Sequence, residues 1–209
     1  MQTPLEIINL SKVYNNKEAV KNISFKVNKN EILGILGPNG CGKTTTIGMI
    51  LGLLKPSSGQ VLINGNEIEK KRVDLLSQLN FISPYIELPK KLTVKQNLEV
   101  YGRLYDVKNL KEKINSLSEK LRLENIINKI TGELSSGQKN RVSLAKSVIN
   151  DPVVLLLDEP TASLDPETGD FVRSFLESYQ KEKKTSILLA SHNMAEVERL
   201  CSSVLMMNK

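Results

Sequence analysis

The first part of the chain, residues 5–65, has the apolar spacing of β-strands. Residues 23–27 alternate apolar and polar side chains, which is typical of a strand buried on one face. Residues 31–36 form a more continuous apolar run that meets a glycine-rich turn, and residues 59–65 form a short strand pattern between glycines. A helical pattern over residues 45–54 separates these last two predicted strands.

From about residue 93 to residue 150 the apolar residues lie three and four positions apart, which is the spacing of helices. Thr93 can cap the first of these helices. Residues 110–123 have the pattern of a second helix. A third helix is predicted to follow Gly137 and to end before Pro152.

Two continuous apolar runs, residues 153–157 and 186–190, come after Pro152. Such runs fit strands that are buried on both faces of a parallel sheet. A helical pattern over residues 167–183 lies between them, so the three segments are predicted to form a β-α-β unit. The whole pattern predicts an α/β fold with a mostly parallel sheet, an antiparallel β region and an inserted α-helical subdomain.

The composition suits one globular domain without disulfide bonds. The chain has 209 residues, 40% of them hydrophobic, and its two cysteines have no metal-binding spacing. The net charge of +6 comes largely from scattered lysines, which fits a solvated surface and also suits an anionic ligand or an anionic membrane face. Aromatic residues make up 4%, and no basic run is long enough to indicate a nucleic-acid partner.

The sequence carries no targeting or membrane-spanning pattern. No apolar run approaches the roughly 20 residues that a spanning helix needs. The first ten residues lack the basic and then apolar layout of a signal peptide. We therefore expect a cytoplasmic protein, and any role at a membrane must come through a partner.

Residues 37–45 match the phosphate-binding loop pattern G-x-x-x-x-G-K-[ST], between a predicted strand and a predicted helix. Glycines let backbone N–H groups approach phosphate oxygens. Lys43 can reach the outer phosphates of a nucleotide, and the Thr44 hydroxyl can bind Mg²⁺. The predicted nucleotide-binding residues of this loop are Gly37, Pro38, Asn39, Gly40, Cys41, Gly42, Lys43, Thr44 and Thr45.

The apolar run at residues 153–157 ends in two carboxylates, Asp158 and Glu159. In phosphate-loop enzymes the first carboxylate helps to hold Mg²⁺. The second can orient or deprotonate the attacking water. An acidic turn after a strand is common by itself, but its occurrence together with a phosphate loop favours a site for ATP hydrolysis with Mg²⁺ as cofactor.

Further motifs follow in order along the chain. Residues 134–138 read Leu-Ser-Ser-Gly-Gln, residues 162–165 read Ala-Ser-Leu-Asp, and the single histidine, His192, follows the predicted strand at 186–190. Tyr14 precedes all the other motifs. Together with the phosphate loop and the acidic strand end, these motifs resemble the nucleotide-binding domain of ATP-binding cassette (ABC) transporters, from residue 5 to about residue 208.

The resemblance implies a role for each of these residues. Tyr14 stacks on the adenine, unless it packs on the sheet. His192 is a catalytic residue that contacts phosphate or positions water, the alternative being a structural or surface histidine. Asp165 belongs to the D-loop beside the nucleotide. The signature motif, which contacts the ATP held by a partner subunit, supplies Ser135, Ser136, Gly137 and Gln138.

The sequence departs from the family pattern at two positions. Ser136 stands where glycine is usual, and Pro84 stands where the Q-loop usually has a glutamine that contacts Mg²⁺ and water. Ser83, Gln78 or a water can replace that ligand, or coupling can rely on shape alone, which we favour because water completes Mg²⁺ coordination readily. The sequence leaves import and export open, and the variant Q-loop favours export.

The resemblance implies a phosphate-loop NTPase core, residues 1–83 and 152–209, and a helical subdomain at residues 84–151. Two such subunits form a homodimer around two ATP molecules, and a separate transmembrane permease subunit binds the dimer at the cytoplasmic face of the membrane. ATP binding and hydrolysis then power transport. Two alternatives are a soluble ABC ATPase without a transport role, whose coiled-coil insertions or tandem cassettes are not seen, and a kinase or GTPase.

Overall fold

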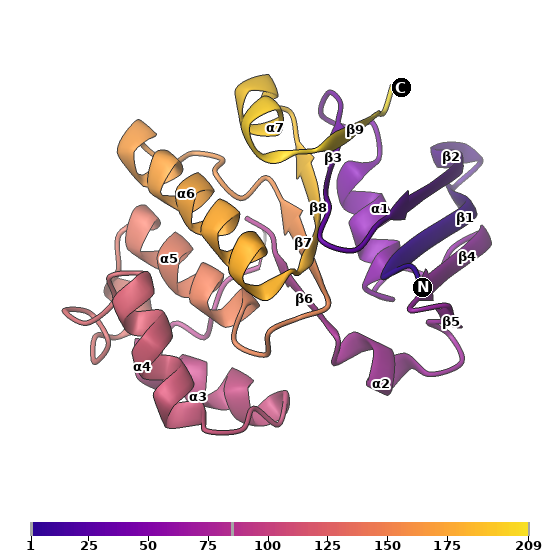
Figure 1. The fold of residues 1–209 in the computed structure, drawn as a ribbon. Coiled ribbons are helices and arrows are strands. Elements are labelled where there is room, and N and C mark those ends of the chain that lie inside the picture. The colour runs from indigo at the N-terminus through magenta and orange to yellow at the C-terminus, as the bar shows by residue number, and fades with distance from the viewer. Residues whose placement is uncertain (1, 85, 209) are drawn as a thin grey trace.

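Figure 1 shows the computed structural model of the chain, which describes residues 2–84 and 86–208. The expected core limits at Met1 and Lys209, and Tyr85 in the expected helical subdomain, lie outside the described residues. The strands are β1 (Leu5–Tyr14), β2 (Lys17–Val27), β3 (Ile32–Leu36), β4 (Ser58–Ile63), β5 (Asn66–Glu67), β6 (Leu79–Ile82), β7 (Val154–Asp158), β8 (Ser186–Ser191) and β9 (Ser203–Met206). The α-helices are α1 (Lys43–Ile50), α2 (Arg72–Leu76), α3 (Val94–Leu104), α4 (Leu110–Lys120), α5 (Ser136–Ser147), α6 (Pro166–Lys183) and α7 (Met194–Leu200), and a short 3₁₀ turn covers Thr131–Glu133.

The central sheet is parallel throughout, with the strand order β6-β7-β8-β3-β9. The predicted β-α-β unit is present as β7, α6 and β8, and both of its strands are buried along their whole length. Because the strands of this sheet run the same way, the residues at their carboxyl ends meet at one edge. That edge brings together the loop after β3, Ser83 after β6, Asp158 at the end of β7, and His192 after β8.

The second sheet is antiparallel, with the strand order β2-β1-β4-β5. Leu5 and Ile63 of this sheet share one buried cluster with Met49 of α1 and with Ile35 and Leu188 of the parallel sheet. Helix α1 therefore packs between the two sheets, as the right side of Figure 1 shows. This packing fixes the loop at the start of α1 relative to both sheets.

Helices α3, α4 and α5 lie on the side of the parallel sheet away from the antiparallel sheet (Figure 1). Thr93 caps α3 as predicted, because its hydroxyl accepts from the Gln96 N–H while the Gln96 side chain accepts from the Thr93 N–H. Helix α4 ends at Lys120, before the predicted residue 123, because the chain turns at Arg122, whose φ is 53°. The division of the chain into a core and a helical subdomain remains a prediction.

Among the described residues, none of the helices combines the length and the apolar character that a membrane span requires.

Candidate nucleotide-binding and hydrolysis site

The loop between β3 and α1 turns tightly at its glycines. Gly40 and Gly42 have φ values of 82° and 104°, and a Cβ on Gly42 would lie 2.5 Å from the carbonyl oxygen of Ala19. Only glycine fits this backbone without strain. The loop ends at the N-terminus of α1, where free N–H groups and the helix dipole favour an anion. The geometry suits a phosphate group bound by the loop backbone.

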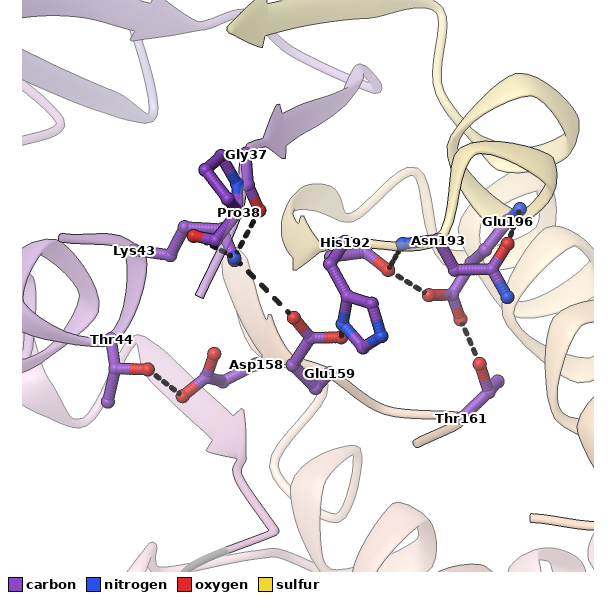
Figure 2. A network of polar contacts seen from close by, with 11 residues as sticks. Gly37, Pro38, Lys43, Thr44, Asp158, Glu159, Thr161, His192, Asn193 and Glu196 are labelled. Carbon is purple, nitrogen blue, oxygen red and sulfur yellow. Dashed lines mark hydrogen bonds and ion pairs between the residues drawn. The ribbon is translucent and has the colours of Figure 1, made fainter. Parts of the chain in front are cut away.

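Lys43 is held over this loop. Its ammonium donates hydrogen bonds to the carbonyl oxygens of Gly37 at 2.6 Å and Pro38 at 3.3 Å, and it lies 3.7 Å from a carboxylate oxygen of Glu159 (Figure 2). The side chain is only 6% exposed. The Lys43 ammonium can exchange its hydrogen bonds to these carbonyl oxygens for hydrogen bonds to a phosphate bound at the same loop. The exchange is favourable because hydrogen bonds to an anionic phosphate are stronger than those to a neutral carbonyl.

Three side-chain oxygen groups, from Thr44, Ser83 and Asp158, lie close together next to the phosphate loop. The Thr44 hydroxyl donates to Oδ2 of Asp158 at 2.9 Å, and the Ser83 hydroxyl lies 3.5 Å from the same oxygen. Asp158 is 1% exposed, so burial raises the pKa of its carboxyl group, while the hydrogen bond from Thr44 opposes that rise. The other oxygen, Oδ1, is buried and has no hydrogen-bond partner among the described residues.

This set of donors fits Mg²⁺. Hydroxyl and carboxylate oxygens are its preferred protein ligands, and it usually keeps waters and takes phosphate oxygens from the substrate. The described residues contain no group of three His, Cys, Asp or Glu side chains that could enclose a metal by themselves. The site therefore suits a cation that arrives with a nucleotide, held by Thr44 and Asp158, rather than a cation caged by protein alone.

Glu159 and His192 are in direct contact. Figure 2 shows Nδ1 of His192 pointing at Oε2 of Glu159, at 2.8 Å, from the loops that follow β8 and β7. Glu159 has a φ of 51°, and its N–H donates to the Ala190 carbonyl at 2.8 Å, which anchors this unusual backbone to β8. Oε1 of Glu159 faces Lys43 without a hydrogen bond from the described residues. One carboxylate oxygen is thus available to accept a proton from water.

The signature residues form the start of α5. The Ser135 hydroxyl accepts from the Gln138 N–H at 3.3 Å, and the Gln138 side chain accepts from the Ser135 N–H at 3.0 Å, so these two residues form a capping box. Ser136 is exposed beside them, and a Cβ on Gly137 would lie 3.3 Å from Thr168. The N–H groups of Ser135 and Gln138 are used in this capping box, so the N–H groups of Ser136 and Gly137 are the ones this helix N-terminus can offer to an anion.

Asp165 caps the next helix, α6. Its carboxylate accepts from the N–H of Thr168 at 2.9 Å and from the hydroxyl of Thr168 at 2.7 Å, and these hydrogen bonds lower the pKa of Asp165. Asp165 lines a surface cavity of about 800 Å³ together with the four signature residues. A separate cavity of about 710 Å³ is lined by Gly40 and Cys41 of the phosphate loop. The cavity of the signature residues thus has no phosphate-loop residue in its lining, while Ser136 also lines a smaller cavity together with Glu159.

Tyr14 lies at the end of β1, with its side chain 44% exposed and the Lys12 ammonium 4.9 Å from the ring centre. The ring lies outside the two buried core clusters. An exposed aromatic face suits stacking on a base. Its assignment to the adenine remains a prediction.

In the Q-loop variant the residue before Pro84, Ser83, is the one that lies next to the proposed Mg²⁺ ligand Asp158. Ser83 lies beside Asp158, whereas the Gln78 amide bonds to Asn64 and to the Asp74 carbonyl. Pro84 is exposed on the wall of a cavity of about 190 Å³ that Glu159 also lines. Of the substitutes considered from the sequence, the geometry favours Ser83 over Gln78.

Sequence reasoning did not identify one buried carboxylate near the site, Glu196 of α7. It accepts hydrogen bonds from Thr161 and Ser191, which flank the two catalytic candidates in the sequence. The available signal was an acidic residue in the first turn of a helix that follows His192. That signal is weak, because acidic residues commonly stabilise helix N-termini.

A parallel sheet with a phosphate loop, a Thr–Asp pair and an acidic residue at its carboxyl edge defines a phosphate-loop nucleotide-binding protein. The chain belongs to the ABC transporter family, whose family model matches residues 20–162. The α/β fold predicted from the sequence is confirmed by solved structures of ABC ATP-binding proteins. An "ATP binding subunit of ABC transporter" superposes with a TM-score of 0.91 at 28% identity, covering 99% of this chain and 86% of that one.

Two curated relatives give the same family assignment. The ABC transporter ATP-binding protein NatA of Bacillus subtilis is 36% identical over 194 residues, covering 91% of this chain and 78% of NatA. The Nod factor export ATP-binding protein I of Rhizobium johnstonii is 40% identical over 200 residues, covering 94% of this chain but 64% of that relative. Both relatives are transporter proteins, so they favour an ATP-binding transporter subunit over a non-transport ATPase.

A third comparison links the fold to a larger assembly. The cbiO1 protein of Clostridium perfringens, described as part of the ABC transporter complex cbiONQ, superposes with a TM-score of 0.85 at 30% identity. The match covers 100% of this chain and 86% of cbiO1.

Proposed function

We propose that the chain hydrolyses ATP to ADP and phosphate and thereby powers an ABC transporter. The observation that carries the proposal is the contact of Lys43, Glu159 and His192 at the edge of the sheet, where Thr44 also meets Asp158. A phosphate-binding cation, a carboxylate that can take a proton and an imidazole are brought to one place by three different strands. Family membership supports the same activity.

Each residue has one task in this scheme. The backbone of the phosphate loop and the Lys43 ammonium bind the outer phosphates of ATP. Thr44 and Asp158 would hold Mg²⁺, which, when bound, offsets the negative charge of the phosphates. Glu159 orients a water for attack on the γ-phosphorus and accepts its proton as the bond to the ADP oxygen breaks.

His192 acts beside Glu159. Its Nδ1 donates to Oε2 of Glu159, and Nε2 is directed away from that carboxylate. In the neutral ring Nε2 is an acceptor that can position the attacking water, and in the doubly protonated ring it can donate to a γ-phosphate oxygen. The His192 side chain is 55% exposed, so its contact with the γ-phosphate would form at the protein surface. A second molecule can cover that surface. Bulk water is then excluded around the attacking water, which strengthens the electrostatic interactions in the site.

The second molecule in our proposal is another copy of the chain. The signature residues Ser135 to Gln138 and Asp165 line a cavity that the phosphate loop does not line. Each copy would then supply its signature residues to the ATP on the other copy's phosphate loop. Such a head-to-tail contact is made twice in a symmetric pair and closes on itself.

The proposed permease partner is a separate transmembrane chain, which would hold this subunit at the cytoplasmic face of the membrane. The cbiONQ complex named for one structural neighbour supports assembly with other subunits. The Nod factor export protein, 40% identical, supports export as the direction of transport. The chain covers 64% of that relative, so its cargo is not carried over.

The decisive test is Glu159→Gln, which keeps the shape of the side chain but removes the base. We expect ATP binding to persist, turnover to fall about 100-fold or more, and an ATP-bound dimer to accumulate on size exclusion with Mg²⁺. Lys43→Ala is the matched control, because it should lose ATP binding and therefore the dimer as well. Turnover of Glu159→Gln at the wild-type rate would rule out the proposed role of the site.

A further inference from the structure

Glu196 is a charged residue in the protein interior. It lies in the first turn of α7, is 2% exposed, and forms no ion pair with any Lys, Arg or His of the described residues. Its Oε1 accepts from the Thr161 hydroxyl at 2.7 Å, and its Oε2 accepts from the Ser191 hydroxyl at 2.7 Å. Burying a carboxylate is costly unless its oxygens are hydrogen-bonded, so these two hydroxyls are what make the position tolerable.

The two hydroxyls belong to the two segments that carry the catalytic candidates. Ser191 is the last residue of β8 and directly precedes His192. Its oxygen also accepts from the Asn193 N–H at 3.0 Å, so the peptide on the other side of His192 is tied to the same hydroxyl. The Ser191 hydroxyl can satisfy both contacts only while its proton points at Glu196.

Thr161 stands in the turn that follows β7, two positions after Glu159. That turn is closed by a hydrogen bond of 3.1 Å from the Ala162 N–H to the Glu159 carbonyl. Figure 2 shows Thr161 and Glu196 on one side of the network and the Glu159–His192 contact on the other. One carboxylate therefore bridges the segment of Glu159 and the segment of His192, behind the 2.8 Å contact between those two side chains.

Helix α7 is itself fixed, so Glu196 is a firm reference point. Asn193 caps the helix by accepting from the Glu196 N–H at 3.4 Å. At the other end, Arg199 donates to Glu177 at 2.7 Å and to Ser174 at 2.9 Å, both on α6. These contacts hold α7 against α6, and with it the carboxylate that Thr161 and Ser191 share.

We propose that Glu196 is a positioning residue that sets the placement of Glu159 relative to His192 by holding Thr161 and Ser191 on one carboxylate. The inference rests on the proposed function, because it assigns Glu196 a role only through those two catalytic residues. It requires a carboxylate in particular. A glutamine replaces one of the two accepting oxygens with an NH2 group that only donates, so either Thr161 or Ser191 would lose the acceptor for its hydroxyl proton.

Thr161 provides the cleanest test, since substitution of the buried Glu196 also changes folding stability. Thr161→Val keeps the shape and removes the hydroxyl, whereas Thr161→Ser keeps the hydroxyl. We expect Thr161→Val to lower kcat about tenfold with the KM for ATP changed less than about twofold, because small misplacements of catalytic groups act on the chemical step. Thr161→Ser should restore kcat to within about twofold of the wild type.

Two further measurements separate positioning from a purely structural role. In a His192→Ala background, Thr161→Val should change kcat less than about twofold, because no pair is left to position. Glu196→Gln should lower kcat, as Thr161→Val does. An unchanged kcat in Thr161→Val, or an equal loss with and without His192, would overturn the proposal.

The proposed function is tested separately in the same assay by Glu159→Gln. If Glu159→Gln stalls turnover and Thr161→Val does not, only the role of Glu196 is wrong. If Glu159→Gln turns over normally, the catalytic assignment itself is wrong.

Discussion

Asp158 is buried in the protein, yet its proposed role as a Mg²⁺ ligand requires a negative charge. Its buried position raises the pKa of the carboxyl group, and the neighbouring Glu159 carboxylate raises it further. A carboxyl whose pKa is raised by folding stabilises the folded state only at low pH, and that contribution is lost as the pH rises above its usual value. At neutral pH the ionised Asp158 therefore costs stability in the absence of Mg²⁺, and the proposed cation relieves that cost.

Asp158→Asn should accordingly make the ligand-free protein more stable while weakening its response to Mg-ATP. Asparagine keeps an oxygen that can accept from Thr44, but it carries no charge. We expect a gain on the order of 1 kcal/mol at pH 7.5 and a smaller rise in the melting temperature than in the wild type when Mg-ATP is added. Thermal unfolding with and without Mg-ATP measures both effects.

Glu124→Gln is the matched control for Asp158→Asn. It neutralises an exposed carboxylate, so it should change stability by less than about 0.5 kcal/mol and keep the response to Mg-ATP. A loss of stability in ligand-free Asp158→Asn would show that the buried charge is not the dominant cost at this position.

At the scale of elements, α5 is joined to β6 through a buried lysine. The Lys146 ammonium donates to Oδ1 of Asn80 at 3.0 Å and to the Phe81 carbonyl at 3.2 Å, and it lies 4.4 Å and 5.2 Å from the ring centres of Phe81 and Tyr101. Burial lowers the pKa of Lys146 to about 8. The link connects the helix that begins at the signature residues to the strand that leads to Ser83.

The lowered pKa of Lys146 has a defined effect on stability. Between pH 8 and the usual lysine pKa of about 10.4 the unfolded chain binds more protons than the folded one, so the contribution of Lys146 to stability rises with pH. Urea unfolding of the wild type and of Lys146→Met at pH 7.5 and pH 9.5 tests this. We expect the wild type to gain stability relative to the variant at the higher pH.

The comparison with Lys146→Met also removes other titrations. Burial raises the pKa of the Cys201 thiol to about 12, which lowers stability above pH 9, but this effect is present in both proteins and cancels in their difference. A difference in unfolding free energy that stays constant from pH 7.5 to pH 9.5 would contradict the buried-cation account.

The elements that the sequence predicted well are those with long periodic patterns. Thr93 with the apolar positions after it predicted α3, and the runs at 153–157 and 186–190 predicted the buried parallel strands. The short strand β9 was not identified, because its sequence, Ser-Val-Leu-Met, does not alternate polar and apolar residues and its strand structure comes from pairing with β3. Propensity is weak for such segments, and tertiary contacts decide them.

The same distinction holds for the site. The phosphate loop and the Asp158–Glu159 pair are local motifs, so the sequence predicted them directly. Glu196 and Lys146 depend on contacts between residues far apart in the chain, which no local pattern records. Pro84 could be recognised as a departure, but only the structure shows that the Ser83 hydroxyl lies next to Asp158.

At the scale of the whole molecule, the separation of the phosphate loop from the signature residues predicts how activity depends on concentration. If each site needs residues from two chains, specific ATPase activity should rise with protein concentration and level off once dimers form. Steady-state ATPase from nanomolar to micromolar protein measures this. A flat profile over that range would indicate a complete site in a single chain.

Mixing two inactive variants provides a second test of the shared site. Lys43→Ala disables the phosphate loop of one chain, and Ser136→Glu places a negative charge among the signature residues of the other. In a mixed dimer one site carries both changes and the other carries neither. An equal mixture should therefore recover about a quarter of the wild-type activity if the sites work independently. No recovery above the separate proteins would argue against the head-to-tail pair.

The position of β3 in the sheet has a consequence for how the protein folds during its synthesis on the ribosome. Its neighbours are β8 and β9, with Ile32 opposite Ile187 and Leu33 opposite Ser203. The strand that precedes the phosphate loop therefore cannot pair until these two later segments have been synthesised. At synthesis rates of roughly 5–20 residues per second, that wait lasts on the order of ten seconds. During it, an apolar strand lacks both of its partners and is open to misassociation. The capacity to hold a nucleotide thus arrives late in synthesis, and the nascent chain depends in the meantime on its antiparallel sheet and on whatever shields exposed strands in the cell.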